Sequence, residues 1–159
     1  MDTTAASAID TSDREIAATR IFDAPRELVW KAWTDPKQIV QWWGPNGFTT
    51  TTYEMDVRPG GIWRLVMHGP DGRDYPNRIT FLEVVEPERL VFRHGGGDDV
   101  EPVNHETTVT FEALGKKTKL TMRMLFVSPE ARRFVAEKYG AVEGLDQTLG
   151  RLGDFVSGA

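Results

Sequence analysis

The middle of the chain consists of short segments in which apolar and polar residues alternate with a period of two. Six such segments lie at about 48–57, 62–68, 73–85, 89–95, 104–112 and 118–127, and a seventh precedes them at about 14–22. A period of two places every second side chain on the same face of a β-strand. Because short turns separate most of these segments, they predict a seven-stranded antiparallel sheet.

Three helices are predicted around these strands, each beginning at a proline that follows a capping residue. The pairs are Asp23 with Pro25, Asp35 with Pro36, and Ser128 with Pro129. The helices cover about 25–33, 36–43 and 129–156. The third carries apolar residues at three- and four-residue spacing, which is typical of an amphipathic helix. It is the element long enough to cover the sheet, and the chain is therefore predicted to be α+β.

The turns between the strands predict which side chains share a face of the sheet. Four-residue loops would pair Val57 with Ile62, His68 with Arg73, and Val85 with Leu90, while the last hairpin would pair Phe111 with Leu120. Residues paired across a hairpin point to the same side. The side chains predicted to face the long helix are Tyr53, Met55, Val57, Ile62, Arg64, Val66, His68, Tyr75, Ile79, Phe81, Glu83, Val85, Leu90, Phe92, His94, Val109, Phe111, Leu120, Met122, Met124 and Phe126. An error of one residue in any loop would invert that strand.

Composition and charge exclude several classes of function. The net charge is −5 and the sequence pI is about 5.2, whereas a nucleic-acid or anionic-membrane surface requires a basic stripe. No apolar run approaches the roughly 20 residues of a membrane span. The absence of cysteine excludes disulfides, thiolate catalysis and cysteine-based zinc sites, and it is compatible with the cytoplasm.

The chain is predicted to form one domain. Residues 1–13 are polar and acidic, which is typical of a disordered tail. Residues 14–159 then form a single domain, large enough to bury a core without disulfides or metals.

Two adjacent tryptophans, Trp42 and Trp43, stand before a Gly-Pro pair that ends the second helix. Adjacent helical residues point about 100° apart, so both rings cannot enter one core through the same face. One interpretation is that both serve only packing. The other is that one indole forms part of a ligand's wall, since it offers a large apolar area with a polar N–H at its edge.

A charged residue is also predicted on the apolar, helix-facing side of the sheet. Arg64 lies there beside His68, and a buried guanidinium without a partner is costly. One interpretation is an internal salt bridge to Glu83. The functional interpretation is that Arg64 faces a cavity and receives the carboxylate or phenolate of a ligand.

A metal site is not expected. His94 and His105 are predicted to lie close together across a strand pair, near Asp98, Asp99 and Glu101. None of these residues has the spacing of true metal ligands, which favours a solvated rim. Neither a metal nor a cofactor is therefore predicted.

Four stretches of the sequence resemble a known family. They are FDAPRELVWKAWTDP at 22–36, QWWGPNGFT at 41–49, DVRPGGIWRLVMHGPDGRDYPNRITFLEVVEPERLVF at 56–92 and YGAVEGLDQTLGRL at 139–152. With the order of the elements, they resemble the START-like (SRPBCC) superfamily. The resemblance is strongest to the bacterial branch related to the C-terminal domain of the Aha-type activator of heat-shock chaperone ATPase. It covers about residues 20–157.

This resemblance implies a helix-grip fold, in which a curved sheet wraps around the long C-terminal helix. Many relatives bind apolar small molecules in a cavity between the sheet and the helices. The residues that we expect to line such a cavity are Trp42, Trp43, Tyr53, Met55, Arg64, Val66, His68, Phe81, Glu83, Phe92, Met122 and Met124.

Two functions are consistent with this resemblance. The first is binding of an apolar or aromatic small molecule, with modest acid-base chemistry through Arg64, His68 or Glu83 left open. The second is a protein-interaction module with a chaperone partner. The first is preferred, because the partner-binding N-terminal domain of eukaryotic Aha-type proteins is not expected here. A cytoplasmic monomer or homodimer without nucleic-acid or membrane partners is expected in either case.

Overall fold

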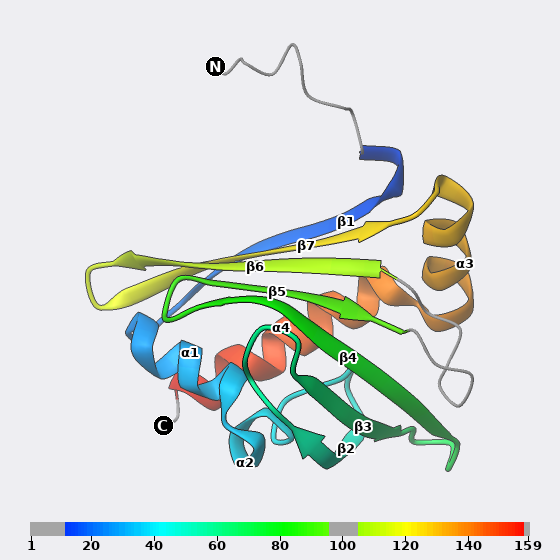
Figure 1. Cartoon of the computed structure of the whole chain (residues 1–159), viewed down its shortest axis with the longest axis horizontal. Coiled ribbons are helices and arrows are strands. Elements are labelled where there is room, and N and C mark those ends of the chain that lie inside the picture. The colour runs from blue at the N-terminus through cyan, green and yellow to red at the C-terminus, as the bar shows by residue number, and fades with distance from the viewer. Residues whose placement is uncertain (1–11, 96–104, 158–159) are drawn as a thin grey trace.

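A seven-stranded antiparallel sheet forms the frame of the computed structural model, which describes residues 12–95 and 105–157 (Figure 1). The strands are β1 (Glu15–Phe22), β2 (Thr49–Met55), β3 (Ile62–His68), β4 (Asp74–Val85), β5 (Arg89–His94), β6 (His105–Leu114) and β7 (Lys117–Phe126). Their order across the sheet is β1-β7-β6-β5-β4-β3-β2, and every neighbouring pair is antiparallel. The prediction of an α+β fold with seven antiparallel strands is confirmed.

The helices lie against one face of this sheet (Figure 1). After a short 3-10 turn, η1 (Ser12–Arg14), they are α1 (Arg26–Thr34), α2 (Pro36–Ile39), α3 (Pro129–Tyr139) and α4 (Ala141–Ser157). The last of these, α4, runs across the sheet, and α1 packs against β6, β7 and α4. Four side chains spaced along one stripe of α4 are buried: Leu145, Leu149, Leu152 and Val156. The prediction of an amphipathic helix from the apolar spacing is therefore confirmed for α4, whose apolar stripe is buried.

The predicted single helix over 129–156 is wrong in one respect, because it is two helices. Ser128 begins α3, and its side chain accepts a hydrogen bond from the Ala131 N–H at 3.0 Å. Gly140 ends α3 with φ at 60°, in the left-handed region. Glycine adopts this conformation without the steric cost that a Cβ imposes, which is why it commonly ends helices. The apolar periodicity spans the break because α3 and α4 contact the same sheet.

The register of the last hairpin is confirmed. Phe111 pairs with Leu120, and the chain turns between Leu114 and Lys117. The residues predicted to face the helix from these strands, Val109, Phe111, Leu120, Met122 and Phe126, are all buried.

The orientation predicted for β3 is wrong, and the cause is one extra residue in the loop that follows it, between β3 and β4. His68 pairs with Asp74 instead of Arg73, and the Gly69 N–H donates to the Arg73 carbonyl at 2.8 Å. This shift of one residue inverts the strand. Trp63, Leu65 and Met67 therefore face the helices, with Trp63 and Leu65 fully buried. Ile62, Arg64, Val66 and His68 point to the outer face.

β-Bulges in β2 and β4 change which face of the sheet some predicted residues occupy. The pairing shifts between Thr52 and Glu54 in β2, and Tyr53 is 64% exposed there. In β4 the pairing shifts between Phe81 and Glu83. Phe81 therefore stays in the core as predicted, whereas Glu83 lies on the outer face and Val85, paired with Arg89, is exposed. A bulge changes the parity of a strand without any mark in the period-two pattern.

Candidate ligand-binding cavity

A cavity of about 270 Å³ lies between the sheet and the two C-terminal helices. Its sheet wall is formed by Met67, Tyr75, Asn77, Phe92, His94, His105, Met122 and Met124. Its helix wall is formed by Val135, Lys138, Ala141, Gly144, Leu145 and Thr148, and the segment before β2 adds Trp43, Gly44, Pro45 and Phe48. Most of these side chains are apolar, so the cavity suits an apolar occupant.

The break between α3 and α4 helps to form the cavity, because both helices contribute to its wall. Gly144 faces it from the first turns of α4. A Cβ added there would meet only Pro45, at 3.4 Å, within 4 Å. The missing side chain leaves space between α4 and the segment before β2, at the cost of up to about 1 kcal/mol of helix propensity.

A half-buried arginine, Arg151, holds the segment before β2 against α4. Nη1 of Arg151 donates to the carbonyls of Gly44 at 2.9 Å and of Pro45 at 3.0 Å. Gln147 supports the same segment by accepting a hydrogen bond from the Asn46 N–H at 3.1 Å. Burial lowers the pKa of Arg151 from its usual value, but the guanidinium stays charged, which strengthens its bonds to the carbonyls. This wall of the cavity is therefore fixed to the helix.

The two adjacent tryptophans have different environments. Trp42 is fully buried, and its indole N–H donates to the Ala32 carbonyl at 3.0 Å. Its ring lies 4.9 Å from that of Trp33 in an edge-to-face contact. Trp43 is 7% exposed, contacts Trp63 edge-to-face at 4.9 Å, and lines the cavity. The structure thus distributes the pair between the core and the cavity wall.

The polar end of the cavity is formed by two histidines and an asparagine. His94 and His105 pair directly across β5 and β6, and their ring centres lie 5.0 Å apart. Nε2 of His94 lies 2.5 Å from Oδ1 of Asn77, and Nδ2 of Asn77 donates to the Tyr75 carbonyl at 2.8 Å. Nδ1 of His105 is buried without a hydrogen-bond partner in the described part of the chain.

Burial keeps both imidazoles uncharged at neutral pH. Desolvation lowers the pKa of His94 to about 4. The pKa of His105 is lowered by its burial and, secondarily, by the neighbouring His94. The predicted proximity of these histidines is confirmed, whereas their predicted place on a solvated rim is wrong. Both histidines lie in the wall of the cavity instead.

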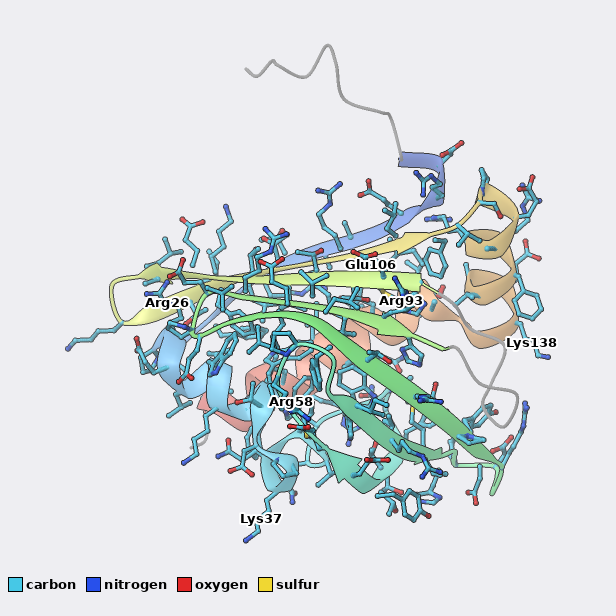
Figure 2. All side chains as sticks on the ribbon, in the orientation of Figure 1. Arg26, Lys37, Arg58, Arg93, Glu106 and Lys138 are labelled. Carbon is cyan, nitrogen blue, oxygen red and sulfur yellow. The ribbon has the colours of Figure 1, made fainter. Side chains whose placement is uncertain are left out.

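No group of three or more histidine, cysteine or acidic side chains able to hold a metal occurs in residues 12–95 and 105–157. Asp98, Asp99 and Glu101, the acids considered beside the histidine pair, lie outside the described residues. Lys138 is the cationic residue among the described lining residues. It extends from the last turn of α3 (Figure 2), and its ammonium lies 5.5 Å from the ring centre of Phe134.

The structure brings together only part of the predicted site. Among the predicted residues, Trp43, Phe92, Met122 and Met124 line the cavity. Trp42, Met55 and Phe81 belong to the core or pack against it. Tyr53, Arg64, Val66, His68 and Glu83 point away from the helices, because the loop before β4 and the two bulges shift their strands.

Charged residues of this outer group find partners at the surface. Arg64 makes a long ion pair with Glu54 at 3.8 Å, and Glu83 pairs with Arg89 at 3.1 Å. The interpretation of an internal salt bridge between Arg64 and Glu83 is therefore wrong. His68 lies 2.8 Å from both the Thr51 hydroxyl and the Asp74 carboxylate. None of these groups reaches the cavity.

Sequence reasoning missed Asn77, Met67 and the helix wall. Asn77 lies two residues from both Tyr75 and Ile79 in β4, and these two were predicted correctly to face the helices. The period-two pattern could therefore have placed Asn77 on the same face. Met67 was missed because of the inverted strand.

Replacement of Arg64 by methionine is expected to leave both stability and cavity binding nearly unchanged. The side chain is about half exposed, and exposed ion pairs contribute at most about 1 kcal/mol. Arg151→Met is the matched comparison, because it removes the donor to two carbonyls of the cavity wall and is expected to cost about 1–3 kcal/mol. Urea denaturation of both variants measures the difference. A larger loss in Arg64→Met than in Arg151→Met would contradict the assignment.

The sheet, the covering C-terminal helices and the cavity between them define a START-like domain with the helix-grip fold. A family model described as activator of Hsp90 ATPase homolog 1-like protein, AHSA1, matches residues 23–157. The chain therefore belongs to this family. None of the described helices has both the length and the apolarity to cross a membrane.

Solved structures from several bacteria are similar over nearly the whole chain. A protein from Arthrobacter aurescens has a TM-score of 0.86 at 28% identity and covers 95% of this chain and 90% of its own. Protein Ms6760 from Mycobacterium smegmatis has a TM-score of 0.81 at 28% identity, with 92% and 93% covered. Protein NE0264 from Nitrosomonas europaea has a TM-score of 0.82 at 25% identity, with 94% and 97% covered. No significant match was found among curated proteins.

Proposed function

We propose that this protein binds an apolar or aromatic small molecule in the cavity between the sheet and helices α3 and α4. The observation that carries the proposal is the cavity of about 270 Å³ with walls of Trp43, Phe92, Met122 and Leu145. Ligand pockets in proteins commonly measure about 300–1,000 Å³. The cavity lies near the lower end of this range, which suits a small aromatic ligand of two or three rings.

The energetics of the cavity wall support the same proposal. A wall made of large apolar side chains gains about 25 cal/mol for each Å² of apolar surface that a ligand removes from water. Because Arg151 fixes the segment before β2 to α4, little conformational entropy is lost when that wall orders around a ligand. We propose that binding occurs in the cytoplasm, in a monomer or a homodimer.

Replacement of Gly144 by leucine is expected to weaken binding of the fluorescent apolar probe N-phenyl-1-naphthylamine at least tenfold. The added side chain would fill part of the cavity, since only Pro45 lies within 4 Å of a Cβ at this position. The matched control is Gly150→Leu on the same helix, where the residue is exposed and nothing lies within 4 Å. Both variants gain helix propensity equally. Titration of the probe should give wild-type affinity for the control only.

The proposal fails if wild-type protein does not bind the probe, or if both leucine variants bind it as the wild type does. Native mass spectrometry of protein purified from its own host would identify the physiological ligand as an added mass that is absent from the Gly144→Leu variant.

A second candidate function is modulation of a chaperone ATPase, and the match to the AHSA1 family model favours it. The two functions are separated by an ATPase assay with an Hsp90-type chaperone. Stimulation that persists in Gly144→Leu would support the second function, because it would then not depend on the cavity.

A further inference from the structure

The amide of Asn77 fixes the position of the proton on His94. Nδ2 of Asn77 donates to the Tyr75 carbonyl, which turns Oδ1 toward His94. An amide oxygen only accepts hydrogen bonds. The contact of 2.5 Å between Oδ1 and Nε2 of His94 therefore requires that Nε2 carry the proton.

Nδ1 of His94, a residue that lines the cavity, is consequently the unprotonated nitrogen of the ring. A neutral imidazole has one protonated and one unprotonated nitrogen, and burial keeps this ring neutral at pH 7. Nδ1 takes part in no hydrogen bond with the described part of the chain. It therefore offers a lone pair to a donor from outside the protein.

His105 has the complementary arrangement. Its Nδ1 is enclosed and meets no partner in the described residues. An enclosed N–H without an acceptor is rarer in proteins than an under-used acceptor, so the proton belongs on Nε2. The neutral ring of His105 then offers a donor beside the acceptor of His94.

We propose that this histidine pair recognises a hydroxyl group on the apolar or aromatic ligand, so that the cavity prefers a phenol or an alcohol to the matching ether or carboxylate. A hydroxyl both donates and accepts, and it would donate to Nδ1 of His94 and accept from Nε2 of His105. The ring centres are 5.0 Å apart, and since a hydrogen bond spans about 2.8 Å, one oxygen can bridge the two rings where both nitrogens face it. This inference rests on the proposed function, since it concerns a ligand in the same cavity.

An ether or a carboxylate fits this pair less well. Each accepts without donating, so the lone pair of His94 would face another lone pair. A carboxylate would also lose its hydration, and Lys138, the cationic lining residue in the described ranges, lies on the helix wall opposite the sheet.

The experiment compares 2-naphthol, 2-methoxynaphthalene and 2-naphthoic acid as competitors that displace N-phenyl-1-naphthylamine from wild-type protein at pH 7. The three share one ring system and differ only in the polar group. The naphthol is expected to bind about tenfold more tightly than the ether, the scale of one net hydrogen bond or slightly more. The acid is expected to bind most weakly.

Two phenylalanine variants assign the preference to the cavity histidine. His94→Phe keeps a flat ring but removes the acceptor, and the ratio of naphthol to ether affinity is expected to fall close to one. The control His68→Phe changes a histidine on the outer face and should keep the wild-type ratio.

Equal affinities of naphthol and ether for the wild type would overturn the inference while leaving the proposed function intact. An unchanged ratio in His94→Phe would overturn it as well. If that variant does not fold, the wild-type comparison decides alone. Failure of every competitor and of the probe to bind would overturn the proposed function, and this inference with it.

Discussion

Replacement of Trp42 by alanine is expected to lower the free energy of unfolding by about 3–5 kcal/mol, the usual cost of removing a large buried aromatic side chain. Trp42 is fully buried and contacts both Trp33 and Trp43 through its ring. Its loss also leaves the Ala32 carbonyl without its N–H donor. Most domains of this size are stable by about 5–15 kcal/mol, so the variant should lose a large part of its stability.

Urea denaturation followed by circular dichroism measures this effect, with Tyr53→Ala as the control. Tyr53 is 64% exposed, and its replacement should change the free energy of unfolding by less than about 0.5 kcal/mol. Equal losses in the two variants would show that Trp42 is not a core residue.

The tryptophan pair shows what could and could not be predicted from the sequence alone. The two adjacent rings and the Gly-Pro stop predicted that they occupy different environments. The sequence could not show which ring belongs to the core, because that depends on the curvature of the sheet beneath them. Trp33, nine residues earlier in the chain, packs edge-to-face against both rings, whereas the Ala32 carbonyl accepts a hydrogen bond from the indole of Trp42.

The strands show why one edge of the sheet was predicted correctly and another was not. The β6–β7 hairpin turns within two residues, between Leu114 and Lys117, so its register has little freedom. The loop between β3 and β4 is one residue longer than its Gly-Pro-Asp-Gly pattern indicates. That single residue moved Arg64 from the predicted site to the outer face and moved Met67 into the cavity wall.

The polar end of the cavity was only partly predictable. Pairing of His94 with His105 followed from the strands, but the function of the pair depends on Asn77, which lies one strand further along the sheet. Its amide orientation is set by a backbone carbonyl, that of Tyr75. Contacts of this kind leave no periodic signal in the sequence.

Acidification from pH 7 to pH 5 is expected to destabilise the protein through the same histidine pair. Burial lowers the pKa of His94 to about 4 in the folded state, whereas an unfolded histidine titrates near 6.5. Between these values the unfolded state binds the proton and the folded state does not. Stability is therefore complete above about pH 6.5, falls as the pH decreases toward 4, and stops falling through this group below 4.

The groups around His94 strengthen this dependence. His105 has its pKa lowered in the same direction, and Tyr75 and Lys138 are the other titratable lining residues in the described ranges. No described carboxylate lines the cavity to stabilise an imidazolium. Because one pKa unit corresponds to about 1.4 kcal/mol, and His94 is only half-buried, we expect a loss of about 1–2 kcal/mol from this residue between pH 7 and pH 5.

Urea denaturation at half-unit steps of pH tests this expectation in the wild type and in His94→Phe, which cannot bind the proton. The free energy of unfolding should fall less steeply in the variant, whereas His68→Phe should retain the wild-type slope. Carboxylates stay mostly ionised above pH 5, so they contribute little to the difference in this range. Identical slopes in the wild type and His94→Phe would mean that water or a counter-charge reaches the ring. Burial would then not keep the imidazole of His94 neutral, and the proposed recognition of a hydroxyl group, which requires a neutral ring, would lose its support.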